Sequence, residues 1–188
     1  MKTSKIHISI LSLALASLAC SIFVGGPEYP TQTVPYSPNE VLNMNTQIEQ
    51  AFIAGAETGV VTLQITENQL TSFMTEKMQQ QVDPPFTEPQ VLLRNGQMQM
   101  YGKVTQSMFN ANILITMNVG IDELTGQPKI EIVSADFGPL PAPEGINTAM
   151  NAIINEAFTG SLGPVAVGFR LEAISIADGI MTLTGRIK

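Results

Sequence analysis

The sequence predicts an α+β fold in which a long, strongly curved antiparallel β-sheet wraps two or three amphipathic helices. Residues 109–121 place an apolar side chain at seven consecutive period-2 positions, which predicts a strand far longer than the usual five or six residues. The dipeptides at 95–96 and 178–179 are Asx-Gly between alternating runs, which predicts two tight hairpins. Apolar residues at helical spacing follow residues 38 and 66 and would cover one face of the sheet.

Residues 1–19 have the pattern of a secretory signal peptide. Lys2 and Lys5 precede an apolar run at 6–18 that is too short to span a bilayer, and small residues follow up to Cys20. Cys20 is the sole cysteine, and the segment resembles the lipobox of bacterial lipoproteins, with Ser17 where that motif usually has Leu, Val or Ile. The resemblance implies lipidation of Cys20 and membrane attachment at the cell envelope. The alternative is ordinary cleavage that leaves a free thiol, although exported proteins rarely keep a lone exposed cysteine.

The charge balance excludes one class of partner. Without residues 1–19 the chain has seven basic and sixteen acidic residues, a net charge of about −9. Such a surface repels nucleic acid and gains nothing from anionic lipids, so membrane attachment would depend on the acyl chains at Cys20. We therefore expect no nucleic-acid partner, and the sequence specifies no protein partner.

The composition also restricts chemistry. His7, the one histidine, lies in the expected signal peptide, so the remaining chain cannot form a Ser-His-Asp, Cys-His or Cys/His zinc site. Asp122 and Glu123 are the closest carboxylate pair, but they precede Thr125-Gly126 and are expected to be solvated turn residues. We expect no enzyme activity, no metal site and no cofactor.

The N-terminal part of the mature chain divides at residue 38. Residues 20–37, rich in Gly and Pro, are expected to form the lipidated Cys and a flexible tether, followed by one domain at 38–188. Ser37 and Pro38 predict a helix start, and the segment 55–59 its end. The apolar face of this helix would carry Val41, Met44, Ile48 and Phe52.

The next elements follow from local signals. The β-branched residues 60–65 predict a strand, and the capping box at 66–69 predicts a second helix that stops before Pro84. A hairpin is expected at 90–105 around Asn95-Gly96. The second helix would present Leu70, Phe73, Met74 and Met78.

The long strand at 109–121 is expected to turn at Thr125-Gly126 and to return as an antiparallel partner at 129–137. The segment 138–143, with three prolines, breaks the sheet. A third helix follows, and a final hairpin at 165–187 closes the chain. That helix would present Ile146, Met150, Ile153 and Ala157 on one face.

Two segments, 91–104 and 174–187, align without a gap. Each has an Asx-Gly turn followed by Met, a large apolar residue, Gly and a base at the same offsets. The match indicates a duplicated helix-plus-hairpin unit; the alternative is two unrelated hairpins with the same turn. Gly102 and Gly185, inside strand patterns, predict bends or bulges.

The apolar face of the sheet has two interpretations. Helices fill it completely as a packed core, or the sheet leaves a tunnel that accepts acyl chains. Nine methionines remain after cleavage, and their flexible side chains suit changing contents. The candidate lining residues are Leu70, Phe73, Met98, Met100, Ile113, Ile115, Met117, Val119, Ile132, Met150, Ile153, Val167, Phe169, Leu171 and Met181.

The order of elements over residues 60–188 resembles small bacterial lipoproteins of the YceB type, and more loosely the LmeA and YpmS groups. The lipobox, the Thr66–Leu70 helix start, the meandering strands and the final hairpin carry this resemblance. It implies a tubular lipid-binding, or TULIP-like, half-barrel around a lipid-sized cavity. The implied function is a membrane-anchored lipoprotein that binds a lipid or other hydrophobic ligand. The alternative is a non-catalytic envelope scaffold with a packed core, and an envelope hydrolase ranks third.

Overall fold

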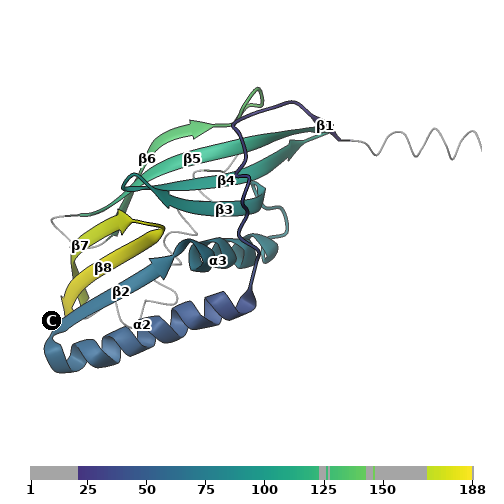
Figure 1. Cartoon of the computed structure of the whole chain (residues 1–188). Helices are drawn as coiled ribbons and strands as arrows, with labels where there is room; N and C mark the ends of the chain where they lie inside the picture. Colours follow the sequence, from purple (N-terminus) through teal and green to yellow (C-terminus); the bar gives the residue numbers. More distant parts are fainter. Residues whose placement is uncertain (1–20, 123–125, 127, 143–145, 147–168, 188) are drawn as a thin grey trace, which may run out of the picture.

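The computed structural model describes residues 21–122, 126, 128–142, 146 and 169–187 (Figure 1). Within these residues the fold is α+β, with a strongly curled sheet that forms a half-barrel of 216° and a second sheet beside it. The predicted fold class is therefore confirmed. The elements are β1 (Ile22–Phe23), α2 (Pro38–Thr58), β2 (Val60–Thr66), α3 (Glu67–Gln79), β3 (Thr87–Arg94), β4 (Gln97–Gln106), β5 (Phe109–Ile121), β6 (Pro128–Asp136), β7 (Phe169–Ala177) and β8 (Ile180–Ile187).

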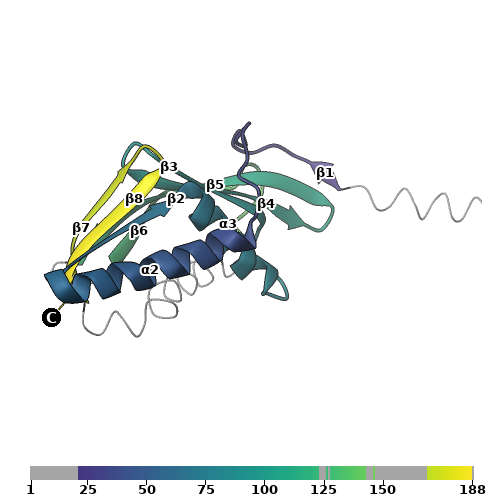
Figure 2. The ribbon, with the colours of Figure 1, turned by 60° about the horizontal axis from the view of Figure 1, so that its bottom comes forward.

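The strands form two sheets. Sheet A has the order β1-β5-β4-β3, with β6 also paired to β5, and sheet B has the order β2-β8-β7. Among the described strands, every pair is antiparallel except β1 with β5, so sheet A is mixed rather than wholly antiparallel as predicted. Figure 2 shows α2 running along sheet B, while α3 covers sheet A beside β3.

Helix α2 begins where the sequence predicts and ends within the predicted segment 55–59. Its capping residue is Ser37, and Pro38 occupies the first turn, where its missing N–H costs nothing. The helix continues through Gly55 and ends at Gly59, whose φ of +76° suits a left-handed cap. Gly55 is buried, and a Cβ there would lie 2.3 Å from the side chain of Val61. Gly55 therefore allows α2 to approach β2 closely and does not end the helix.

Helix α3 has the predicted capping box. The Gln69 N–H donates to Thr66 Oγ1 over 3.3 Å, and the Thr66 N–H donates to Gln69 Oε1 over 3.0 Å. The fully buried Thr71 then ties the helix to β3, because its hydroxyl accepts the Val91 N–H at 2.9 Å. One side chain thus links α3 to the sheet that it covers.

Both predicted hairpin turns are confirmed. Asn95 and Gly96 have φ values of 54° and 75°, and Asp178 and Gly179 have 51° and 76°. Positive φ at both central residues is the type I′ pattern, which matches the twist of the flanking strands.

The two hairpins also share a bulge and an ion pair. The register of β3 shifts between Thr87 and Gln90, opposite Gly102, and that of β7 shifts between Leu171 and Ala173, next to Gly185. In each case the base after the glycine binds a glutamate of the bulge. Lys103 lies 2.6 Å from Glu88, and Arg186 lies 3.0 Å from Glu172. The predicted bulges are confirmed, and the shared details support the duplication; the predicted third helix, apart from the buried Ile146, lies outside the described residues.

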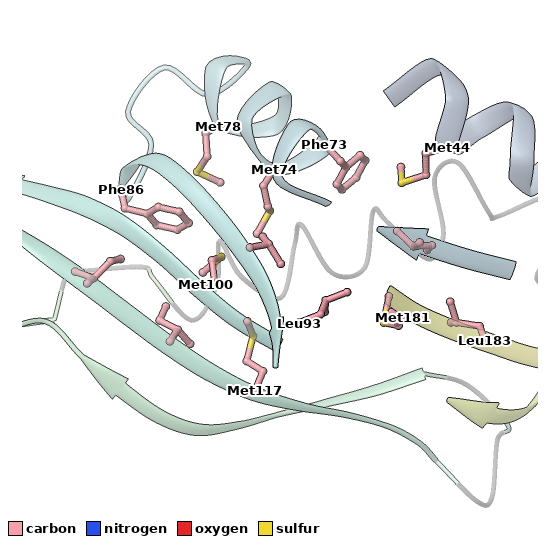
Figure 3. Close-up of a cluster of buried hydrophobic side chains, with 14 of the residues drawn as sticks. Met44, Phe73, Met74, Met78, Phe86, Leu93, Met100, Met117, Met181 and Leu183 are labelled. Atoms are coloured by element: carbon pink, nitrogen blue, oxygen red, sulfur yellow. The ribbon is translucent and has the colours of Figure 1, made fainter. Parts of the chain in front are cut away.

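The hydrophobic core joins both sheets and both helices. In Figure 3, Met74 and Met78 of α3 point toward Phe86, which directly precedes β3, and Met100 of β4, while Phe73 is directed toward Met44 of α2. Met181 and Leu183 of β8 continue the same cluster into sheet B, and Met44 and Ile48 reach it from α2. The core is therefore contiguous across the two sheets.

Residues 21–37, called the N-terminal strap below, do not form the flexible tether that the sequence predicted. The strap crosses sheet A in front of β4 and β3 (Figure 1). The Tyr29 hydroxyl donates to the Glu88 carbonyl at 2.5 Å, and the Tyr29 ring packs edge-on against Tyr101 with centroids 6.2 Å apart. Val34 exchanges two hydrogen bonds with the Gln90 side chain, at 2.6 and 3.0 Å. Hydrogen bonds and ring contacts with β3 and β4 therefore hold in place a segment whose composition predicts flexibility.

Candidate functional site

Most of the predicted lining residues meet in one cluster. The structure brings together residues from α3, β4, β5, β7 and β8, some fully buried and others packed against them at partial burial. These are Leu70, Phe73, Met98, Met100, Ile113, Ile115, Met117, Val119, Leu171 and Met181.

Ile132 does not belong to this cluster. It is 44% exposed, although it pairs with the fully buried Met117 on β5. The register shifts here, because Thr116 pairs with Ser134 and Val133 is the extra residue of a bulge. A bulge increases local twist and turns an edge strand away from the core face, so the prediction for Ile132 is wrong.

Four other predicted lining residues cannot be placed. Met150, Ile153 and Val167 lie outside the described residues, and of Phe169 only the backbone, as the first residue of β7, is described.

The centre of the cluster is tightly packed. Met100, Ile113 and Met117 expose 0% of their surface, and Ile115 exposes 1%. A side chain that borders a space large enough for water would expose surface to it. By this measure, and within the part of the chain that the structure describes, these four side chains have the burial of a packed core.

A cleft lies where sheet A meets sheet B. It has a volume of about 750 Å³, within the range of small-molecule sites, and is lined by Gly120, Ile121, Asp122, Gly126, Arg170, Leu171, Glu172, Ala173 and Ile174. The Leu171 N–H donates to the Gly126 carbonyl at 3.2 Å, which joins β7 to the turn after β5. This backbone hydrogen bond links the two walls of the cleft.

The lining of the cleft is amphipathic. Leu171 is 4% exposed and belongs to the core, and Ile121 and Ile174 pack against the core at partial burial. Asp122, Arg170 and Glu172 supply the polar side of the same cleft. The arrangement suits a ligand with an apolar part and a polar part, because each part finds a matching wall.

A second hollow, of about 460 Å³, lies between the N-terminal strap and the start of α3. Glu67 and Arg94 line it, but these two side chains bind each other. Strap residues 30–35 supply most of the remaining wall. We assign this hollow to the junction of strap and helix rather than to a ligand.

Tyr29, in the described part of the chain, has a clearly shifted pKa. Burial raises the pKa of the Tyr29 phenol from 10.0 to about 12, and the nearby Glu88 carboxylate adds to the rise. Tyr29 lies in the strap, outside the lining of the cleft. The described residues contain no group of three or more His, Cys, Asp or Glu side chains that would hold a metal ion.

Neither of the two described helices combines the length and the apolar character that a membrane span requires. Comparison of the chain with protein-family models and with curated proteins gives no match.

Sequence reasoning missed most of the cleft. Ile121 stood at the end of an alternating run and Ile174 in the internal repeat, but nothing in either pattern relates β5 to β7. Arg170, Glu172 and Ala173 had no signal of their own, because a seam between two sheets is a tertiary feature. Leu171 is the predicted lining residue that the cleft retains.

Proposed function

We propose that this chain is a membrane-anchored lipoprotein that binds a lipid or other hydrophobic ligand at the cell envelope and does not alter it chemically. The cleft of about 750 Å³ between β5 and β7 carries this proposal, because Leu171 connects it to the apolar core. The apolar part of a ligand would lie against Leu171, Ile121 and Ile174, and its polar part beside Arg170 and Glu172.

The methionines beyond the cleft give a route for longer ligands. Met100, Met117 and Met181 belong to the cluster that Leu171 joins. Methionine has three rotatable side-chain bonds and accommodates changes of shape at low cost. A long acyl chain would enter by displacing these side chains rather than by filling an existing tunnel.

Two sequence features support the same function. The signal-like segment ending at Cys20 supplies the proposed lipid anchor, and two or more acyl chains hold a protein stably on a membrane. The resemblance to YceB-type and LmeA-type lipoproteins implies the same class of ligand. The curled half-barrel is compatible with a TULIP-like lipid-binding fold.

The first test is native mass spectrometry of the chain from residue 20 with Cys20→Ser, after incubation with liposomes and followed by lipid extraction. A discrete added mass that resolves into a lipid class is the expected result. A bare protein mass under the same conditions would contradict ligand binding.

A matched pair of variants locates the site. Ala173 lines the cleft, whereas Ala177 is an exposed alanine of the same strand outside it. Ala173→Trp fills the cleft and should abolish the added mass, and Ala177→Trp should leave it unchanged. Equal lipid retention in both variants would exclude the cleft as the site.

One observation favours a second function, the non-catalytic scaffold. The fully packed side chains of Met100, Ile113 and Met117 are what a protein without an internal ligand requires. In that case no lipid co-purifies, and partners bind the acidic surface or a sheet edge. A bare mass combined with a protein cross-linked to this chain in the envelope would favour the scaffold.

A further inference from the structure

Four large apolar side chains are exposed together at one end of sheet A. Ile22, Phe23, Met108 and Phe109 are 50%, 61%, 52% and 40% exposed, and we call them the apolar tip. They come from β1 and from the turn that joins β4 to β5, which lie at the same end of the molecule (Figure 1). Contiguous exposed apolar side chains indicate an interaction surface.

Backbone hydrogen bonds hold the apolar tip in one shape. The Ile22 N–H donates to the Met108 carbonyl at 2.6 Å, and the Val24 N–H donates to the Asn110 carbonyl at 2.8 Å. Ile22 and Phe109 are direct partners in the parallel β1–β5 pair, so their side chains lie on the same face of the sheet. Phe23, the next residue of β1, points to the opposite face, so apolar side chains are exposed on both faces of this end of the sheet. The backbone that carries them is already paired and requires no ordering before the tip binds.

The apolar tip is electrically neutral in a strongly acidic chain. Residues 21–26 and 105–112 contain no Asp, Glu, Lys or Arg. A basic partner would be attracted to the acidic surface elsewhere, and an acidic partner would find no base at the tip. A neutral bilayer interface needs no complementary charge and accepts Phe, Ile and Met side chains.

The position of the proposed lipid anchor favours a membrane as the surface that covers the tip. Cys20, the proposed lipidation site, is two residues before Ile22 of the tip. We infer that the apolar tip inserts into the interfacial region of a lipid bilayer, as a contact additional to any acyl chain. This inference rests on the proposed membrane anchor at Cys20 and not on ligand binding, so it holds whether or not the cleft binds a lipid.

The single cysteine allows a test that does not depend on acylation by the cell. The chain from residue 20 is coupled through Cys20 to phosphatidylcholine vesicles that contain a maleimide lipid. The chain has no tryptophan, so Phe109→Trp introduces a unique fluorescent probe at the tip. On coupling, its emission should shift to the blue and be quenched by phosphatidylcholine brominated in the acyl chains.

Ile53→Trp is the matched control, because Ile53 is 63% exposed on α2, away from the tip. Its emission should be unchanged by coupling and by brominated lipid. Equal behaviour of the two probes would overturn the inference. Phe23→Trp serves as a second tip probe if Phe109→Trp unfolds by circular dichroism.

Two further outcomes separate insertion from its alternatives. Phe23→Gln with Met108→Gln should abolish quenching of the Phe109→Trp probe, and added salt should not, because no charge holds the tip. A blue-shifted probe and a dimer in sedimentation before any vesicle is added would show that a second copy covers the tip, which would also overturn the inference.

Discussion

Both carboxylate oxygens of Glu67 accept hydrogen bonds from the guanidinium of Arg94. Oε1 accepts from Nη1, and Oε2 accepts from Nη2 at 3.1 Å. Oε1 also accepts the Leu93 N–H at 2.6 Å, while the Glu67 backbone N–H donates to the Gly179 carbonyl at 3.2 Å. The first residue of α3 thus binds the end of one hairpin and the turn of the other.

This junction predicts a measurable loss of stability in Glu67→Gln. The Glu67 side chain is only 16% exposed, and the substitution keeps its shape while removing the charge and one acceptor. Loss of a charge-assisted bond near a buried N–H should lower the free energy of unfolding by about 1–3 kcal/mol, as measured by urea denaturation.

The exposed pair of Glu172 with Arg186 is the control. These side chains are 44% and 67% exposed, so Glu172→Gln should change the free energy of unfolding by less than about 0.5 kcal/mol. Equal losses of unfolding free energy in the two variants would mean that the Glu67 contacts stabilise the fold no more than an exposed ion pair does.

A methyl group added at Gly102 should disturb the packing around it. A Cβ at this position would lie 2.6 Å from the ring of Phe86, which is 1% exposed and has little room to move. Gly102→Ala should therefore destabilise the fold by about 1–3 kcal/mol through overpacking. The loss should appear as a lower midpoint in thermal denaturation.

Gly120→Ala is the matched substitution in the neighbouring strand. A Cβ there meets no atom within 4 Å and the backbone is not left-handed, so the change should be neutral or slightly stabilising. A neutral Gly102→Ala would show that the Phe86 ring shifts freely, contrary to the packing described.

Ionisation of Tyr29 should lower the stability of the folded protein at alkaline pH. Its pKa is raised to about 12 by burial and by Glu88, whereas in the unfolded chain it is near 10. The proton is therefore held more tightly in the folded state, and the contribution of this group is complete below pH 10. It should be lost as the pH rises from about 10 to 12, because the unfolded chain ionises first.

Tyrosinate absorbance checks this prediction, since the chain has two other tyrosines, Tyr36 and Tyr101. One tyrosine should titrate about two pH units after the normal value, and Tyr29→Phe should remove that late step. Tyr29→Phe should also flatten the fall in thermal midpoint between pH 10 and 12. A late step that persists in Tyr29→Phe would assign it to another residue.

The stability of Met117→Ala should show whether the interior beside Met117 is packed or contains a space. If the cluster is packed core, Met117→Ala leaves a cavity and should lower the free energy of unfolding by about 2–5 kcal/mol. Met98→Ala, at a partly buried position on the neighbouring strand, should cost less. A small loss at Met117 comparable to that at Met98 would indicate a space already present beside it.

The elements with strong local signals were predictable. The Asx-Gly turns fix both hairpins because positive φ at two successive residues leaves few alternatives, and the long alternation of 109–121 survives as β5. The capping box at Thr66 was equally reliable, since both of its hydrogen bonds lie within four residues.

The misses have non-local causes. The N-terminal strap looked flexible because its partners lie far along the chain, as when Asn112 Nδ2 donates to the Pro27 carbonyl. The alternation of residues along the strand predicted that the Ile132 side chain faces inward, but the bulge at Val133 interrupts that alternation. The cleft arises where β5 and β7 meet, and no window of the sequence contains both strands.

The pairing of β2 with β8 sets the order in which this chain reaches its native state. Val61 lies opposite Gly185, so β2 and its hydrogen-bond partner β8 are separated by more than a hundred residues of the sequence. Pairing at such separation carries a large loop-closure entropy and slows folding. A chain that is synthesised from its N-terminus has no partner for β2 until β8 has emerged from the ribosome. Closure of sheet B is thus a late event, and until then the apolar face of β2 depends on α2 for cover.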